Sequence, residues 1–235
     1  MGQTTGVGRF CKEGFTGHAS RCGGHLGYAL YLAQNGGKHA QAKPLKGFGS
    51  AGVLEVVEGD DGNTYRAVYT VRFSNAIYVL HCFQKKSHKG IATAKQDMDM
   101  VRDRLKLAQQ HAEEMNIVER GSTNVYADLG LDNADEMLVK AQLASKIGDI
   151  IKRRKLTQIQ AAELLGISQP KLSGLLRGQF RGISESKMLE CLTRLGRDVQ
   201  IVVKATPRSR TDGHVSVVFA QGLKFGSGRF GADMY

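Results

Sequence analysis

Four polar side chains suited to reading DNA lie close together in the second half of this 235-residue chain. They carry an amide, an ammonium, a hydroxyl and a guanidinium group, on Gln169, Lys171, Ser173 and Arg177. Such groups hydrogen-bond base edges in the major groove, and the charged ones also bind phosphate. The apolar residues Leu172 and Leu175 fall between them. A helix over this stretch would therefore bury one side and present the polar side chains on the other.

A second helix and a sharp turn are needed to hold this polar face, and the preceding residues supply both. Ala162 is small, as required where two helix backbones touch, and Gly166 tolerates the positive φ of the turn. Thr157 and Gln158 begin the first helix, where backbone amides and side chains can bind a phosphate. The sequence therefore predicts a DNA-binding helix-turn-helix. Its expected contact residues are Thr157, Gln158, Ser168, Gln169, Lys171, Ser173 and Arg177.

The charge of the chain favours a polyanionic partner. Lysine and arginine number 33 against 22 acidic residues, which gives a net charge of +11. Cations on a protein displace counterions condensed on nucleic acid, so a basic excess favours binding to DNA or RNA. Many basic proteins have no specific ligand, however, so the motif carries the prediction and the charge only supports it.

Cysteine usage and hydropathy narrow the remaining classes of function. The four cysteines form no Cys-x-x-Cys pair, which is typical of a reduced cytosolic protein. Residue types that can bind zinc occur close together at Cys11, His18, Cys22 and His25. Their spacings match no familiar zinc motif, so we favour the alternative that they are ordinary loop residues. No stretch approaches the ~20 apolar residues that span a bilayer. We therefore expect a cytoplasmic protein with no metal, cofactor or membrane segment.

The first half is predicted to be a small antiparallel sheet with helices around it. Residues 1–24 are rich in glycine and aperiodic, which predicts a poorly ordered arm. A helical pattern follows from His25 to Gln34, and another runs from an N-cap at Thr93 to about Glu114. Between them lie three β-branched runs separated by turn residues, which predict a meander. The runs cover residues 53–58, 64–73 and 76–83.

The second half is predicted to be helical, in the arrangement of lambda-repressor-like domains. A first helix carries an apolar face from Leu143 to Ile151, and a last helix runs from Ser184 to Gly196. Alternating apolar residues at 199–203 and 215–219 predict a C-terminal β-hairpin. The expected fold class is α+β, with domains at 25–114 and 115–220. Residues 221–235 are predicted to be a disordered tail.

Four motifs of the second half occur in the order found in one known family. They are Val-Tyr-Ala-Asp-Leu-Gly-Leu (125–131), Ala-Ala-Glu-Leu-Leu-Gly-Ile-Ser-Gln-Pro-Lys (161–171), Leu-Leu-Arg-Gly (175–178) and Leu-Gly-Arg-Asp-Val-Gln-Ile-Val-Val (195–203). Through them the chain resembles the XRE-type antitoxins of the HigA kind. This resemblance implies that the domain binds its own operator DNA, usually as a homodimer, and neutralises a partner toxin.

Three motifs of the first half point to that partner. They are Lys-Pro-Leu-Lys-Gly (43–47), Tyr-Arg-Ala-Val-Tyr (65–69) and Tyr-Val-Leu-His-Cys-Phe-Gln-Lys-Lys-Ser (78–87), and Lys95, Asp97 and Arg104 of the closing helix also fit. Through them the chain is similar to the phage-type, RelE-like HigB toxins, which are metal-independent mRNA endoribonucleases that often act at the ribosome. On this resemblance, Arg66, Lys85 and Lys86 would stabilise charge on the scissile phosphate, and His81 or His88 would move a proton. The alternative is that these residues are cations and a strand histidine on the rim of the sheet.

The chain departs from the toxin pattern at its start. Toxins of this type usually open with a strand and long helices, in place of which this chain has the Gly-rich residues 1–24. Leu54 also stands where a basic residue is common. We therefore expect an N-terminally incomplete, impaired toxin domain fused to an antitoxin that begins near Met115. An alternative start at Met115 would give a free antitoxin of residues 115–235.

Three functions are compatible with this reading of the sequence. The favoured one is an autoregulator and antitoxin that binds operator DNA. The second is a metal-independent mRNA endoribonuclease with a tethered neutralising domain, and the third is an inert remnant that associates with an intact toxin. Toxin–antitoxin contacts within one chain and between chains both remain open at this point.

Overall fold

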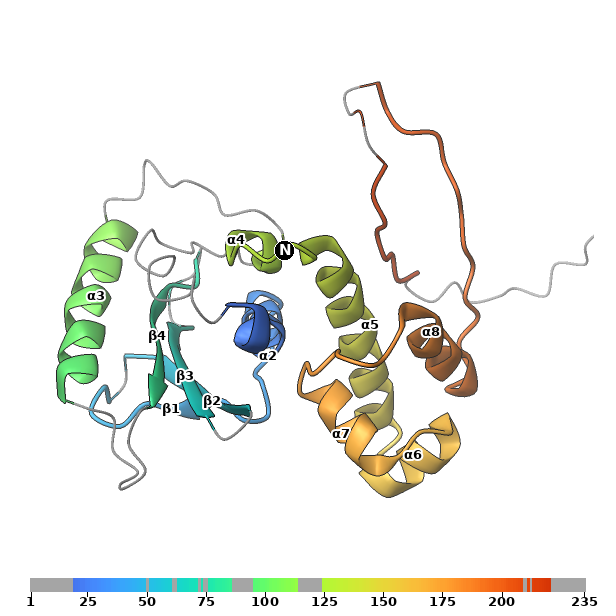
Figure 1. The fold of residues 1–235 in the computed structure, drawn as a ribbon, viewed down its shortest axis with the longest axis horizontal. Helices are drawn as coiled ribbons and strands as arrows, with labels where there is room; N and C mark the ends of the chain where they lie inside the picture. The colour runs from blue at the N-terminus through green and yellow to red at the C-terminus, as the bar shows by residue number, and fades with distance from the viewer. Residues whose placement is uncertain are drawn as a thin grey trace, which may run out of the picture.

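The computed structural model shows an α+β protein, with a sheet in the first half and helices in the second (Figure 1). This confirms the predicted fold class. The structure describes residues 19–49, 51–60, 63–71, 73, 76–85, 95–113, 124–208, 211 and 213–220. Most of the predicted N-terminal arm, the predicted N-cap Thr93 and the predicted tail at 221–235 lie outside these residues. Within them, no helix combines the length and apolarity needed to cross a membrane.

The sheet of the first half is antiparallel, with its strands in the order β1-β2-β3-β4. The predicted meander is confirmed, with β2 at Val53–Asp60, β3 at Asn63–Thr70 and β4 at Val79–Lys85. The short edge strand β1 at Lys43–Pro44 was not predicted, because two residues are too few to show any period. Val68 pairs with His81, and a register shift after this pair brings Tyr69 opposite Val79.

Two helices cover opposite faces of this sheet, as Figure 1 shows: α2 at Ala19–Gln34 and α3 at Lys95–Glu113. Alternation along the strands divides the apolar side chains between the two faces. One face packs with α2 and includes Val56, Tyr69 and Val79. The other includes Val68 and Leu80 and packs with Val101 of α3.

Helix α2 begins at Ala19, six residues before the predicted start at His25. Residues 19–24 therefore belong to a helix, and the prediction of a poorly ordered arm is wrong for them. Glycines weaken a helix because they lose the most backbone entropy, and for that reason the pattern was interpreted as irregular. Here, however, the glycines allow close packing. A Cβ at Gly23 would lie 2.6 Å from Leu131, and one at Gly27 would overlap the ring of Tyr126.

The second half is helical, as its sequence predicts, with five helices among the described residues. They are α4 at Val125–Asp128, α5 at Ala134–Arg153, α6 at Gln158–Leu165, α7 at Gln169–Leu176 and α8 at Glu185–Arg194. The expected apolar face of α5 is confirmed, since Leu143, Ile147 and Ile150 are all buried. Ser184 is the N-cap of α8, and Gly196 follows its end with a positive φ. The one-turn helix α4 was not predicted.

The two halves share one apolar core. Leu26, Tyr28 and Leu30 of α2 belong to the same buried cluster as Tyr126 of α4 and Phe180 of the α7–α8 loop. Helix α2 lies between the sheet on one side and α4 and α5 on the other (Figure 1). The sheet domain and the helical domain are therefore packed against each other within one chain.

The predicted C-terminal hairpin does not form among the described residues. Residues 199–208 and 213–220 contain no strand, and Ile201, Val203 and Val215 are 79%, 92% and 73% exposed. Alternating β-branched residues favour an extended backbone. These two segments nevertheless have no regular secondary structure, and they do not pair as strands. Contacts with the helical domain come from the second segment, where Lys146 lies 4.8 Å from the ring of Phe219 and Val217 packs on the core.

Candidate nucleic-acid interface

The polar residues singled out in the second half are held by two short helices whose ends are well defined. The Thr157 hydroxyl accepts from the backbone N–H of Gln160, and the Gln160 side chain accepts from the N–H of Thr157. This reciprocal capping box satisfies two donors that the first turn would otherwise leave unpaired. The start of α6, where Thr157 and Gln158 lie, is therefore fixed by its own residues.

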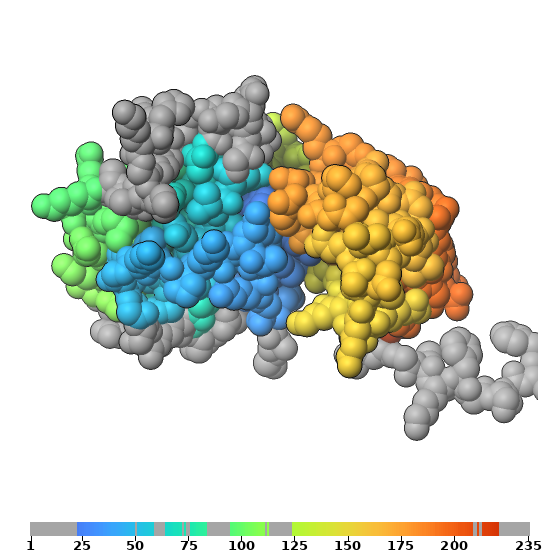
Figure 2. Space-filling model, turned by 90° about the horizontal axis from the view of Figure 1, so that it is seen from below, coloured from blue at the N-terminus to red at the C-terminus, as the bar shows by residue number. Residues whose placement is uncertain are grey.

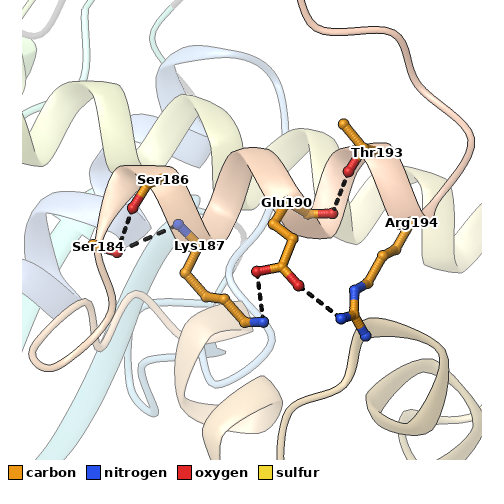
Figure 3. A network of polar contacts seen from close by, with 6 residues as sticks. All are labelled: Ser184, Ser186, Lys187, Glu190, Thr193 and Arg194. Carbon is orange, nitrogen blue, oxygen red and sulfur yellow. Dashed lines mark hydrogen bonds and ion pairs between the residues drawn. The ribbon is translucent and has the colours of Figure 1, made fainter.

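The turn between α6 and α7 depends on Gly166. Its φ of +63° lies in the left-handed region, as the sequence predicted for this position. The guanidinium of Arg194 lies directly against this glycine, where a Cβ would overlap it. Figure 3 shows how α8 places that guanidinium: Glu190 forms ion pairs of 2.8 Å with both Lys187 and Arg194. The hydrogen bond from Lys187 contributes most to lowering the pKa of the Glu190 carboxyl.

The face that α7 presents outward carries most of the predicted contacts. Ser168, Gln169 and Lys171 are exposed, while Leu172 and Leu175 are buried behind them. Ser173 and Arg177 are only half-buried rather than fully outward, and the Arg177 Nε donates to the carbonyl of Ser173 at 3.1 Å. Pro170 occupies the first turn of α7, where its missing N–H costs no helical hydrogen bond.

A contact between the two helices links two of the predicted residues. The Gln169 side-chain amide donates to the Gln158 side-chain oxygen at 2.7 Å, and both residues are exposed. This bond holds the Gln169 amide at the first position of α7 and orients its polar end. The sequence predicted Gln158 and Gln169 as DNA-contacting residues, but it did not predict the hydrogen bond between them. Its signal in the sequence is that each glutamine follows the N-cap of its helix.

A second polar cluster lies in the first half, between β4 and α3. His81 Nε2 lies 3.1 Å from an oxygen of Asp97, and Arg104 donates to the carbonyl of Leu80 at 2.9 Å. The Arg104 guanidinium is also 3.4 Å from His81 Nδ1. Burial lowers the pKa of the His81 imidazole, against an opposing effect of Asp97. The cluster thus holds the His81 imidazole between a carboxylate and a cation.

The predicted catalytic cations are only partly within the described residues. Arg66 is in a 2.7 Å ion pair with Glu55, and only 10% of its side chain is exposed. Lys85 ends β4, while Lys86 and His88 lie outside the described residues. Of the four residues considered for zinc, Cys11 and His18 also lie outside, and His25 faces Glu58 at 3.4 Å. In the part of the chain that is described, no group of three or more candidate metal ligands occurs.

Comparison with known families agrees with this division of the molecule. Residues 125–204 match the family described as "Helix-turn-helix domain", and residues 22–106 match "Phage derived protein Gp49-like (DUF891)". The chain joins a Gp49-like domain to a helix-turn-helix domain. A solved structure titled "Putative XRE Family Transcriptional Regulator" is 40% identical to this chain, and the match covers 37% of this chain and 99% of that one, with a TM-score of 0.36. No curated protein matches the chain.

The Gp49-like domain touches the helix-turn-helix domain at the end of α7. His39 is 1% exposed, and its Nε2–H donates to the carbonyl of Arg177 at 3.1 Å. Its Nδ1 accepts from the backbone N–H of Gln41, so both ring nitrogens of a neutral imidazole are used. Tyr28 packs edge-on against Phe180, with ring centroids 5.5 Å apart. The position of α7 is therefore fixed relative to the Gp49-like domain.

Proposed function

We propose that this chain is a sequence-specific DNA-binding regulator of the toxin–antitoxin kind. The observation that carries the proposal is the outward face of α7, where Gln169 and Lys171 are exposed above buried leucines. A helix that is anchored on one side and polar on the other suits insertion into the major groove. The match to a helix-turn-helix domain family and the net charge of +11 support the same reading.

The toxin–antitoxin context comes from the Gp49-like domain and from the resemblance of the two halves to HigB and HigA. On this basis the DNA is the operator of the protein's own gene. We infer that two copies bind together, with their α7 helices about 34 Å apart on a palindromic site, since that spacing is one turn of DNA. Gln169 would pair with adenine, and Lys171 or Arg177 would contact guanine or phosphate. Thr157, Gln158, Ser168 and Ser173 would complete the contacts to the DNA backbone.

Replacing Gln169 by alanine is expected to weaken discrimination at one base pair by about 2 kcal/mol. The amide is held by Gln158 in an exposed position, so its loss should leave the fold intact. The measurement is a selection of binding sites from randomised duplexes, followed by affinities for single-base variants of the selected site. Ile159→Ala is a suitable control, because it trims an exposed side chain on α6. An equal loss on selected and random DNA would remove the base-reading role.

A second candidate function, metal-independent RNA cleavage, is favoured by the cluster of His81, Asp97 and Arg104. An imidazole beside a carboxylate is suited to moving the proton of a 2′-hydroxyl, and the adjacent cation is suited to a phosphate. The cluster lies on the α3 face of the sheet, whereas the helix-turn-helix domain packs on the α2 side. The helix-turn-helix domain therefore does not pack on this face, which α3 covers and on which His81 is buried.

This second function has a direct test. The full chain would cleave RNA in the presence of a chelator, and His81→Ala would reduce the rate about 100-fold or more. Arg102→Gln is the matched control, since Arg102 lies on the same helix and pairs with Asp99 at the surface. If ribosome-bound and free mRNA both stay intact with the unaltered protein, the endoribonuclease reading fails and the regulator remains.

A further inference from the structure

The segment that follows α2 carries positive charge only. Residues 35–49 contain Lys38, Lys43 and Lys46 and no aspartate or glutamate. All three lysines are exposed, and in the described part of the chain none of their side chains forms an ion pair. A segment of this composition is suited to an anionic partner.

One end of this segment is held against the recognition helix. His39, the neighbour of Lys38, donates to the carbonyl of Arg177, which is the C-cap of α7. Phe180, the neighbour of the exposed Arg181, contacts Tyr28 of α2, and Tyr28 in turn lies edge-on to the His39 ring, 6.0 Å between centroids. Lys38 and Arg181 thus adjoin in sequence two residues of one buried contact between the domains, and Arg177 supplies the accepting carbonyl of that contact. We call these three residues the junction cations.

One face of the molecule presents both the segment after α2 and the helix-turn-helix (Figure 2). Figure 2 shows this face, with the segment after α2 in blue beside α6 and α7 in yellow and orange. A recognition helix in the major groove has phosphate backbones running past its ends. We therefore expect a domain docked at the end of α7 to lie near the flanking phosphates, and residues 35–49 of this domain carry only positive charge.

From this arrangement we propose that the Gp49-like domain takes part in DNA binding. Lys38 binds a backbone phosphate next to those bound by Arg177 and Arg181, which extends the footprint of the helix-turn-helix along the flanking DNA. Contacts of this kind are electrostatic and independent of sequence, so they raise affinity without changing which site is preferred. The inference rests on the proposed DNA-binding function and adds a surface from the other domain.

The test compares Lys38→Gln with the unaltered full chain in gel shifts on the selected site and on random DNA, at several salt concentrations. Lys38→Gln should weaken binding to both DNAs by the same factor, about three- to tenfold. It should also reduce the slope of log affinity against log salt by about 1. Lys38→Arg, which keeps the charge, should retain the original slope.

Lys46→Gln is the matched control for net charge. Lys46 is exposed in the same segment, but its neighbours Leu45 and Phe48 pack on the α3 side of the sheet. If Lys38→Gln and Lys46→Gln have the same effect, the inference is overturned, while selective binding by the unaltered chain would still support the regulator. If the unaltered chain shows no selectivity, the proposed function fails, and the inference that rests on it fails as well.

Discussion

Gly27→Ala is expected to lower the free energy of unfolding of the full chain by about 3 kcal/mol, in spite of the better helix propensity of alanine. A Cβ at Gly27 would overlap the ring of Tyr126, and both residues are buried. The ring has no room to move, because Tyr126 is fully enclosed in the core that both domains share. The substitution should therefore push α2 away from α4. Urea unfolding followed by circular dichroism measures the loss.

Two further variants assign that loss to the contact between the domains. Gly24→Ala gains the same helix propensity on the same helix, and its Cβ would meet the terminal methyl of Met137 at 3.0 Å and the carbonyl of Gly178 at 3.3 Å. Because the methionine side chain is flexible, we expect a change below about 1 kcal/mol. Tyr126→Leu should reduce the cost of Gly27→Ala when the two are combined. Equal effects of the two glycine substitutions would contradict close packing at Tyr126.

Mild acid is expected to weaken the junction through His39. Burial, followed by the nearby His25, lowers the pKa of the His39 imidazole to about 4. The unfolded chain, with an ordinary histidine pKa of about 6.5, binds the proton more readily than the folded one. The contribution of the neutral His39 to the free energy of unfolding is therefore complete above about pH 6.5, and it is lost as the pH falls from about 6.5 towards 4. Between pH 7.5 and pH 5 the loss from this residue is about 2 kcal/mol.

The corresponding measurement is urea unfolding at these two pH values, with His39→Gln for comparison. A glutamine can still donate to the carbonyl of Arg177 but does not titrate, so this variant should lose most of the pH dependence. His214→Gln removes an exposed histidine and should behave like the unaltered protein. An unchanged pH dependence in His39→Gln would show that the junction does not contribute to the acid response.

The features that sequence alone predicted are those set by local chemistry. The left-handed turn at Gly166, the start of the last helix at Ser184 and the buried leucines of α7 each follow from residues a few positions apart. The β-branched runs likewise gave the meander, because strand pairs joined by short turns need only neighbouring segments. The candidate DNA-contacting residues come from this local information, and the structure places most of them on one exposed face.

The features that were missed depend on contacts between distant residues. The early start of α2 depends on Tyr126 and Leu131, which fill the space that the glycines leave. The donation from His39 to Arg177 joins residues 138 positions apart, and no short motif reports it. The C-terminal alternation predicted a hairpin, but pairing also requires a surface to cover the apolar face, and the described residues provide little. The ion pair between Arg66 and Glu55 also joins two strands and was not predicted, while the assignment of Arg66 to a phosphate stays a prediction.

The central claim is that the full chain binds DNA selectively through α7. The most direct test is a gel shift on DNA from just upstream of its own gene, with random DNA in competition and the salt concentration varied. The account predicts retention of the upstream DNA that resists random competitor and weakens as salt rises. Equal retention of upstream and random DNA at every salt concentration would contradict it, and attention would then pass to RNA and to His81.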